Sequence, residues 1–249
     1  MGRLAAIRRH PVKGLGEESL TSVALAPGRH LPHDRAWAVA HGKSAFDPAA
    51  PAWVARRNFV VQANSPEMAR IACAMDEATG AISLSHPALG ALKADPATEG
   101  ARIADWVAPV AAGSGPGPYI LVRQPESGAL TDIADAHVSI GSLATLRALS
   151  ALAGRELAPI RFRMNLWLDG FEPWAEFDWI GREIAIGGAK LTVTARVARC
   201  NAPAASPESG TRDIAVTKLL HANFGHMDFG VYAQVMKGGA VAIGDEARP

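Results

Sequence analysis

Two cysteines are the residues of this sequence best suited to bind a metal or attack an electrophile, and they lie in different settings. Cys73 lies in the small apolar segment from Arg70 to Met75, where a free cysteine usually packs as a minor core residue. Cys200 ends an alternating run and precedes a turn-forming loop rich in proline, serine and alanine. We therefore expect Cys73 to be inert and Cys200 to lie beneath a loop in a ligand pocket.

The run from Lys190 to Cys200 has the two-residue period of a β-strand. This period predicts an apolar face of Leu191, Val193, Ala195 and Val197, and a polar face of Thr192, Thr194, Arg196 and Cys200. Arg196 on that face and Arg199 beside Cys200 bring guanidinium charge near the thiol, which favours the thiolate that binds metals. An inert cysteine at a strand end stays open as the alternative, because one thiol is not a site.

The surroundings of Cys200 exclude two common cysteine chemistries. No histidine or second cysteine stands at metal-ligand spacing from it, so the sequence does not predict a local zinc site. No Cys/His/Asn nucleophile signature accompanies it either, and His221 and His226 follow a predicted helix, so a cysteine hydrolase is not expected. A metal at Cys200 would need ligands from elsewhere.

A second alternating run, from Arg161 to Asp169, holds candidate anion-binding residues. As a strand it would place Arg161, Arg163 and Asn165 on the same face as Asp169. Arginine forks bind phosphate and planar heterocycles, and asparagine offers a donor and an acceptor to a pterin-like edge. The alternative is a solvated outer strand face.

Two further cations lie near the start of the chain. Lys13 stands beside Gly14, and Arg35 has a nearby tryptophan, Trp37. Neither motif is specific alone. The glycine-rich stretch 113–117 lacks the Lys-Ser/Thr ending of a phosphate-binding P-loop, so that class of site is excluded.

Composition indicates an ordinary globular protein of 249 residues, with 49% hydrophobic and 20% charged residues. The 25 basic and 24 acidic side chains nearly cancel, so we expect neither a nucleic acid nor a membrane as partner. No apolar run approaches the roughly 18 residues that span a bilayer, and the first residues lack a signal-peptide core. The expected location is cytoplasmic.

Short apolar and β-branched stretches, separated by glycine and proline, predict a mainly β fold with a few helices. Strands are expected at Thr21 to Leu25, Ala36 to Ala40, Ala81 to Leu84, Tyr119 to Val122, Arg161 to Asp169, Lys190 to Arg199 and Gly230 to Met236. Helices are expected at Ser142 to Ala153 and Ile214 to His221. The loop-rich stretch 111–118 predicts a division into two domains, 1–118 and 119–249.

Motifs spread over nearly the whole chain have an order that resembles one family. They are Pro11-Val12-Lys13, Glu18-Ser19-Leu20, Asp34-Arg35-Ala36-Trp37, the stretch Asp132 to Ile140 with His137, Arg161 to Asn165, Gly181-Arg182, Arg199-Cys200, Pro203, Gly210, Phe229 to Ala233, Gly238-Gly239 and Gly244-Asp245. This series is similar to the MOSC family with its N-terminal β-barrel domain, in particular to the mitochondrial amidoxime-reducing component and its bacterial relatives. Three residues depart from the pattern, namely Gly14, His33 and Ser206, and they weaken inference about the substrate.

The resemblance implies an N-terminal β-barrel-like domain followed by a MOSC β-barrel domain that binds the molybdenum cofactor. It implies that the Cys200 thiolate binds molybdenum, a soft ligand for such a metal. It further implies that Lys13 and Arg35 neutralise the cofactor phosphate, and that Arg161, Arg163 and Asn165 hold its pterin and phosphate edges. The remaining pocket candidates are Asp132, His137 and Ser139.

The function that the resemblance implies is reduction of N-hydroxylated or other N-oxygenated compounds. The sequence has no cysteine cluster for an iron–sulfur centre, so electrons would come from a separate donor of the flavin reductase, ferredoxin or cytochrome type. Two alternatives stay open. One is a non-catalytic cofactor carrier or sulfur-delivery module that uses Cys200. The other is a β-barrel that binds another heterocycle such as flavin.

Overall fold

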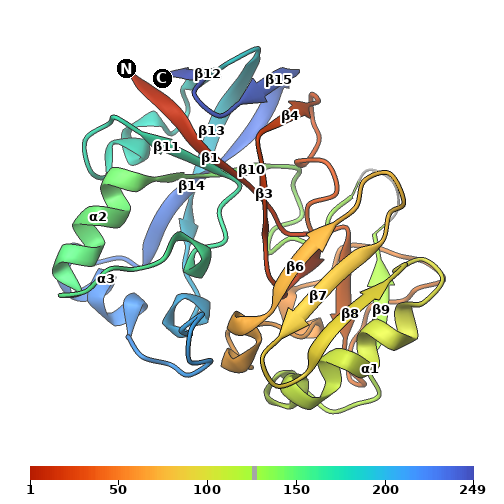
Figure 1. The fold of residues 1–249 in the computed structure, drawn as a ribbon. Coiled ribbons are helices and arrows are strands. Elements are labelled where there is room, and N and C mark those ends of the chain that lie inside the picture. Colours follow the sequence, from red (N-terminus) through yellow and green to blue (C-terminus); the bar gives the residue numbers. More distant parts are fainter. Residues whose placement is uncertain (125–127) are drawn as a thin grey trace.

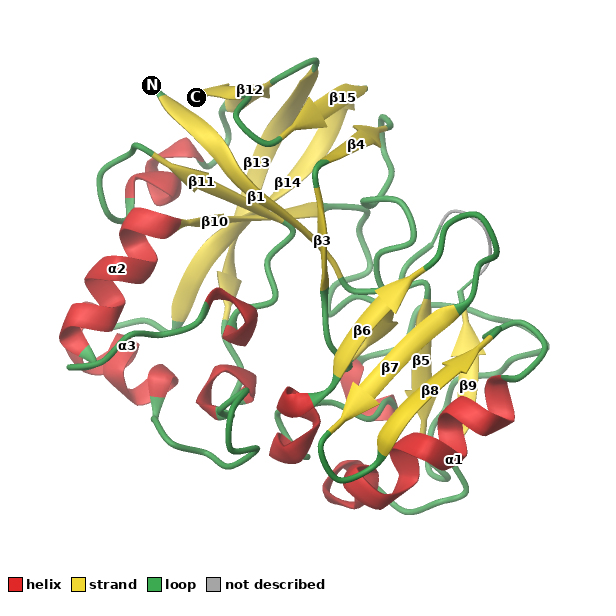
Figure 2. Ribbon diagram, in the orientation of Figure 1, coloured by secondary structure: helices red, strands yellow, loops and turns green. Residues whose placement is uncertain are grey.

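The computed structural model describes residues 1–124 and 128–249, and these form two halves (Figure 1). One half is a closed β-barrel flanked by two helices, and the other holds two small sheets and a third helix (Figure 2). The two chain termini lie side by side at one end of the barrel, where the first and last strands pair. The mainly β fold with few helices is therefore confirmed.

Seven strands close the barrel. They are β1 (Gly2–Arg9), β10 (Val138–Ser142), β11 (Leu166–Asp169), β12 (Glu183–Ile186), β13 (Ala189–Ala198), β14 (Asp228–Lys237) and β16 (Glu246–Arg248). Their order is β11-β10-β14-β13-β12-β16-β1, and the antiparallel pairing of β1 with β11 closes the ring. Val231, Ala233 and Val235 of β14 are buried at every second position, as a strand with one face on a core requires.

The other strands form smaller sheets or extend the barrel. β3 (Glu18–Leu20) pairs with β1, and β4 (Ser22–Leu25) pairs with β15 (Gly239–Ala242). One small sheet holds β2 (Val12–Lys13), β5 (Trp37–Ala40) and β9 (Ile120–Arg123). The other holds β6 (Ala72–Met75), β7 (Ile82–His86) and β8 (Gly90–Ala94). Helix α1 (Gly100–Ala111) packs against β8 and β9.

Both predicted helices exist. In α2 (Leu143–Leu152), the Ser142 side chain accepts a hydrogen bond from the Thr145 amide at 3.2 Å and so caps the first turn. Helix α3 (Val216–Phe224) begins two residues later than predicted and extends further. The pattern analysis did not predict α1, since Gly100 and Pro109 are both unfavourable in helices. No helix in the described ranges is long and apolar enough to cross a membrane.

Most predicted strands lie in β4, β5, β7, β9, β13 and β14, but the first half of the predicted strand from Arg161 to Asp169 is wrong. A 3₁₀ turn covers Pro159–Arg161, Arg163 has a left-handed φ of 52°, and β11 begins only at Leu166. The alternation was misleading because Arg161 is buried together with its apolar neighbours, so polar and apolar side chains do not separate into an outer and an inner face.

The sheets do not divide at residues 118 and 119, where the two predicted domains meet. Strand β1, from the start of the chain, completes the barrel of the C-terminal half. Conversely β9, which follows the predicted boundary, pairs antiparallel with β5 in the N-terminal half. The domain boundary stays a prediction. Each half of the fold contains a strand from the other side of that boundary: β1 lies in the barrel, and β9 lies in the sheet of β5.

Asn165 joins three segments of the barrel at the point where β1 meets β10 and β11. Its Oδ1 accepts hydrogen bonds from the Ser139 amide at 3.1 Å and from the Ser139 hydroxyl at 2.8 Å. Its Nδ2 donates to the Arg8 carbonyl at 3.2 Å. Since Asn165 and Ser139 are both buried, these bonds cannot be replaced by bonds to bulk water.

We predict that Asn165→Ala lowers the free energy of unfolding by about 2 to 4 kcal/mol, because it leaves the buried Ser139 donors without an acceptor. Chemical denaturation measures the change. The matched control is Asn223→Ala in exposed α3, where the amide bonds only the Leu219 carbonyl of its own helix. Equal effects of the two substitutions would contradict the role assigned to Asn165.

A buried carboxyl lies near the start of α2. Glu176, which is fully buried, accepts a hydrogen bond from the Thr145 hydroxyl at 2.8 Å, while its Oε1 has no partner among the described residues. Burial raises the pKa of Glu176 to about 7 from an ordinary value of 4.5. The folded chain therefore holds this proton at pH values where the unfolded chain has lost it.

This difference makes stability depend on pH. The stabilisation from protonated Glu176 is complete below pH 4.5 and is lost as the pH rises through about 7. Glu176→Gln should remove this part of the decline, which is about 3 kcal/mol between pH 4.5 and 8. Unfolding measured across that range tests it, with exposed Glu172 changed to Gln as the control. A decline that survives in Glu176→Gln would count against the assignment.

Candidate functional site

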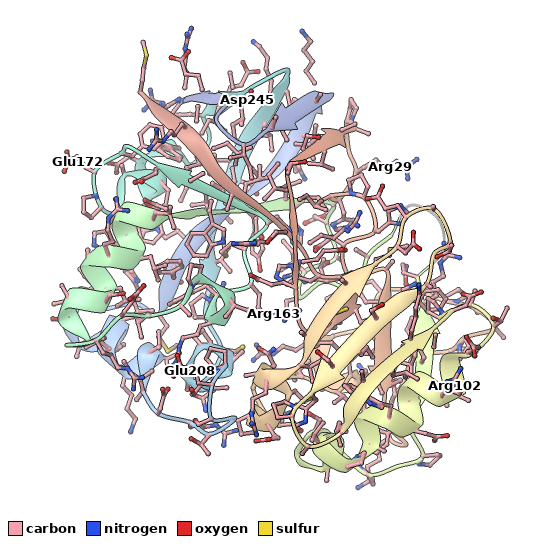
Figure 3. The ribbon with its side chains drawn as sticks, in the orientation of Figure 1. Arg29, Arg102, Arg163, Glu172, Glu208 and Asp245 are labelled. Atoms are coloured by element: carbon pink, nitrogen blue, oxygen red, sulfur yellow. The ribbon has the colours of Figure 1, made fainter. Side chains whose placement is uncertain are left out.

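Cys200 lies where the chain leaves the barrel. β13 ends at Ala198, the Arg199 amide still donates to the Met227 carbonyl at 2.9 Å, and a 3₁₀ turn (Ala202–Ala204) follows. Cys200 is partly exposed, and its side chain lines a pocket to which both halves of the fold contribute. Figure 3 shows Arg163, another residue of this pocket, between the two halves. The pocket therefore depends on how the halves pack together.

Cys73 differs from Cys200 in every relevant respect. It lies in β6 with 3% of its surface exposed and packs in the core of the N-terminal half. Burial raises the pKa of the Cys73 thiol to about 12. At neutral pH this thiol is protonated and inaccessible, so Cys200 is the cysteine available for chemistry.

The predicted apolar face of β13 is buried at Leu191, Val193 and Val197, but Ala195 does not follow the prediction. The pairing with β14 shifts register between Val193 and Ala195 and again between Arg196 and Ala198. These bulges break the two-residue period, so Ala195 is exposed rather than buried with Leu191. Sequence alternation cannot predict a bulge, because the extra residue leaves the pattern of side-chain types unchanged.

The bulges also decide which arginine accompanies Cys200. Arg196 lies over the Phe177 ring at 4.2 Å, 3.9 Å from an Asp228 carboxylate oxygen, and outside the pocket lining. Arg199 lines the pocket instead. It donates to the Phe162 carbonyl at 2.5 Å, and its Nε is buried without a partner among the described residues. Burial lowers the pKa of Arg199, and Cys200 lies close enough to oppose that shift.

The pocket lining carries an excess of positive charge. Its basic residues are Lys13, Arg35, Arg56, Arg163 and Arg199, and its acidic residue is Asp132. Lys13 donates to Asp132 at 2.5 Å. Burial lowers the pKa of Lys13. Burial would raise the pKa of Asp132, but the positive charges of Lys13 and Arg35 outweigh this effect and lower the pKa of Asp132 to about 2. Four cations thus face the pocket without an acidic partner in its lining.

Arg35 and Arg163 are held by backbone geometry and by each other. Both have left-handed φ values of 52°, which non-glycine residues rarely adopt and which cluster at functional sites. The Arg35 Nη2 donates to the Arg163 carbonyl at 2.8 Å. Arg163 in turn donates to the Leu15 carbonyl, while its Nη2 is buried without a partner among the described residues. Burial and nearby Arg35 lower the pKa of Arg163 to about 10.

His137 and Tyr232 form a neutral wall of the pocket. Their rings meet edge to face with centroids 4.4 Å apart. Burial lowers the pKa of His137 to about 4, so the ring is neutral at pH 7, and its Nδ1 donates to the Asp135 carbonyl at 2.7 Å. This tautomer leaves Nε2 as an acceptor. Burial raises the pKa of Tyr232, which keeps its hydroxyl protonated.

Among the predicted site residues, Lys13, Arg35, Asp132, His137, Ser139, Arg163 and Cys200 line this pocket. Arg161 and Asn165 do not. Arg161 instead pairs with Asp213 at 2.8 Å and donates to the Pro203 and Ala205 carbonyls, so it holds the loop that follows Cys200. The side-chain amide of Asn165 forms hydrogen bonds with Ser139 and Arg8 within the barrel. The cofactor-binding roles of the predicted residues stay predictions.

Several polar residues of the lining were not among the predicted site residues, including Arg56, Gln62, Arg199 and Tyr232. Arg56 and Gln62 come from the loop between β5 and β6, and no pattern in the sequence marks them. Gln62 is 5% exposed and makes no side-chain hydrogen bond within the described chain, which leaves its amide free for a ligand. For Arg199 and Tyr232 a signal existed, since each lies in one of the motifs that carry the family resemblance.

A metal at Cys200 would have to bring most of its own ligands. In residues 1–124 and 128–249, no three His, Cys, Asp or Glu side chains are grouped so that they could hold an ion. The pocket therefore offers one thiol, several cations and the unpartnered donors of Arg163 and Arg199. This donor set suits an anionic, metal-bearing organic group better than a bare ion.

Two family models together match nearly the whole chain. A model described as the MOSC domain matches residues 117–248, and one described as the MOSC N-terminal beta barrel domain matches residues 1–108. No curated protein matches. The solved structure of the YUAD protein from Bacillus subtilis is 14% identical with a TM-score of 0.49 and covers 99% of this chain and 93% of that one. YiiM from Geobacillus stearothermophilus is 18% identical with a TM-score of 0.32 and covers 44% and 52%.

The two thiols should differ in reactivity. We predict that iodoacetamide at pH 8 labels Cys200 in the folded, ligand-free protein and labels Cys73 at least about 100-fold more slowly, because the thiolate is the nucleophile. Mass spectrometry of the digested protein measures both sites. Denatured protein, in which both cysteines should react, is the control. Comparable labelling of Cys73 in the folded chain would contradict the assignment.

Proposed function

The chain belongs to the MOSC family, and we propose that it is an oxidoreductase that binds the molybdenum cofactor through the thiolate of Cys200. Its proposed reaction is reduction of N-hydroxylated or other N-oxygenated compounds. The observation that carries the proposal is that the accessible thiol and an excess of cations share one pocket. The MOSC family is associated in general with this cofactor.

The pocket suits the anionic part of such a cofactor, which carries a phosphate and a pterin. Lys13 and Arg35 would meet the phosphate from the N-terminal half, and Arg163 would meet it from the barrel. The unpartnered Nη2 of Arg163 and Nε of Arg199 are buried donors that a bound anion would satisfy. Without such a ligand these donors cost free energy, which supports an anionic occupant.

Cys200 suits the metal-bearing part, because a thiolate is a soft ligand and the protein supplies no competing cluster of oxygen or nitrogen ligands in its described residues. When bound, the cofactor would supply two-electron redox chemistry. Converting an N–OH group to N–H and water takes two electrons and two protons. The tasks left to this chain are to hold the cofactor, admit the substrate and supply protons.

The neutral wall of the pocket fits the last task. Tyr232 keeps its proton because burial raises its pKa, and so it can donate a hydrogen bond or a proton at neutral pH. His137 is neutral, and its Nε2 can accept a hydrogen bond from a substrate hydroxyl. Asp132 stays ionised beside Lys13 and cannot donate.

The electrons would come from a separate protein, because two distant cysteines cannot hold an iron–sulfur cluster. A flavin reductase, a ferredoxin or a cytochrome would serve. The alternative function is a cofactor carrier or sulfur-delivery module, which would use the same thiol without turnover. The two functions differ in whether cofactor leaves the protein.

We predict that Cys200→Ser, made in a host that synthesises molybdopterin, loses bound molybdenum and loses reduction of an N-hydroxylated substrate such as benzamidoxime to background. Elemental analysis and an assay with a chemical electron donor measure the two. Cys73→Ser is the matched control and should keep both, because Cys73 lies in the core of the N-terminal half.

The outcomes separate the candidates. If Cys200→Ser keeps both metal and activity, the proposal is wrong. If the wild-type chain binds molybdenum, reduces no N-oxygenated compound, and restores a cofactor-free molybdoenzyme on mixing, it is a carrier. If purified protein shows flavin absorbance and no molybdenum, the pocket binds another heterocycle.

A further inference from the structure

A chain of buried charges lies directly behind the cation cluster of the pocket. His10, whose side chain is fully buried, stands between two carboxylates. Its Nδ1 is 3.1 Å from Asp34 Oδ1, and its Nε2 is 3.2 Å from Glu17 Oε2. The His10 amide donates to the same Asp34 oxygen at 2.8 Å. Neither His10 nor Glu17 lines the pocket.

Each nitrogen of the His10 ring faces a carboxylate oxygen. A neutral imidazole has one N–H, so one of its nitrogens would face a carboxylate with a lone pair. Each carboxylate also faces an arginine: Asp34 accepts from Arg35 Nη1, and Glu17 lies 3.5 Å from the Nε of Arg8. Two ionised acceptors call for two N–H donors on the ring between them. An imidazolium would supply both.

Each carboxylate also contacts an arginine side chain. The second oxygen of Asp34 accepts from Arg35 Nη1, and Arg35 Nη2 then reaches the Arg163 carbonyl at 2.8 Å. Glu17 lies near Arg163 and is 3.5 Å from the Nε of Arg8. The contacts through Asp34 thus run from the buried His10 ring to Arg35 and on to the backbone of Arg163, the two left-handed arginines of the pocket.

Such a chain solves a specific physical problem. Arg35 and Arg163 repel each other, and burial makes each positive charge costly. Two carboxylates behind them offset that cost, and an imidazolium between the carboxylates keeps these from repelling each other in turn. Removing the ring charge would leave two buried carboxylates close together, and Asp34 would lose the contacts that aim it at Arg35.

We propose that His10 is a positioning residue, which as an imidazolium between Asp34 and Glu17 fixes Arg35 and Arg163 for an anionic group in the pocket. This inference rests on the proposed function, since it concerns the same site. It assigns a role to a residue that touches neither the pocket nor Cys200. The anion acts on Arg35 and Arg163, and His10 acts through them.

The protonation can be observed without any substitution. Long-range ¹H–¹⁵N spectra of ¹⁵N-labelled, cofactor-free protein at pH 7 distinguish an imidazolium from either neutral tautomer. His10→Gln identifies the signal by its absence. The expected result is that both His10 nitrogens carry protons. A neutral His10 ring overturns the proposal.

The positioning is tested with inorganic phosphate as the probe, by calorimetric titration of cofactor-free protein. His10→Gln should raise the Kd for phosphate by about tenfold, because Gln can donate to one carboxylate and not to both. His86→Gln is the matched control. His86 is also buried, and its Nε2 lies 3.3 Å from one carboxylate, that of Glu67, in the N-terminal half.

A second variant separates positioning from simple charge. Glu17→Gln removes a negative charge, so by charge alone phosphate would bind as tightly as before or more tightly. If His10 and Glu17 position the arginines, phosphate binds more weakly despite that change. Tighter or unchanged binding by Glu17→Gln overturns the proposal, and this variant decides the question if His10→Gln does not fold.

The same titration distinguishes this inference from the proposed function. If wild-type protein binds phosphate and both variants bind it equally well, the positioning role is wrong and the cofactor proposal stands. If wild-type protein does not bind phosphate, the anionic pocket of the proposed function fails, and the role of His10 fails with it.

Discussion

The pairing of β1 with β11 is the constraint on which the site depends, because it places the start of the chain inside the barrel formed by its end. Residues that follow β1, including Lys13 and Arg35, are thereby carried to the residues that precede β11, including Arg163. The bonds of Asn165 to Ser139 and Arg8 fix that meeting point. A pocket made by two halves is precise only if such a seam is closed, since neither half contains enough of it alone.

Closing the seam brings like charges together, and the structure must offset their repulsion. It does so with acids that are specific to each cation: Asp132 for Lys13, Asp34 for Arg35 and Asp213 for Arg161. Arg163 and Arg199 each keep a buried donor that has no partner in residues 1–124 and 128–249, and both residues line the pocket. Charge is therefore balanced behind the pocket and left in excess within it, which is the arrangement that an anionic ligand would complete.

Sequence reasoning predicted which residues meet in this pocket better than it predicted the local geometry of the chain. Cys200 was separated from Cys73 by the side chains around each, and the motifs with Lys13 and Arg35 lie on the pocket as the resemblance implied. Faces assigned by alternation failed at Ala195 and before Leu166, because a bulge and a left-handed residue change the direction of the chain without changing residue type. Helix α1 was missed because its proline and glycine outweighed its buried stripe.

One assumption behind the alternation patterns bears on how the site works. A period-two pattern assumes that polar side chains face water, yet Arg161 and Asn165 are buried and bonded to protein, and Arg199 is turned inward beside Cys200. Polar side chains buried near a site must be satisfied by protein or by ligand. The guanidinium of Arg161 pairs with Asp213 and the amide of Asn165 bonds Ser139, and these contacts set the shape of the loop and the seam. A buried Nε without a partner among the described residues does not set Arg161 apart, because Arg199 has one too. The division between residues that build the site and residues that could bind in it thus follows from which of these buried polar side chains line the pocket, as Arg163 and Arg199 do.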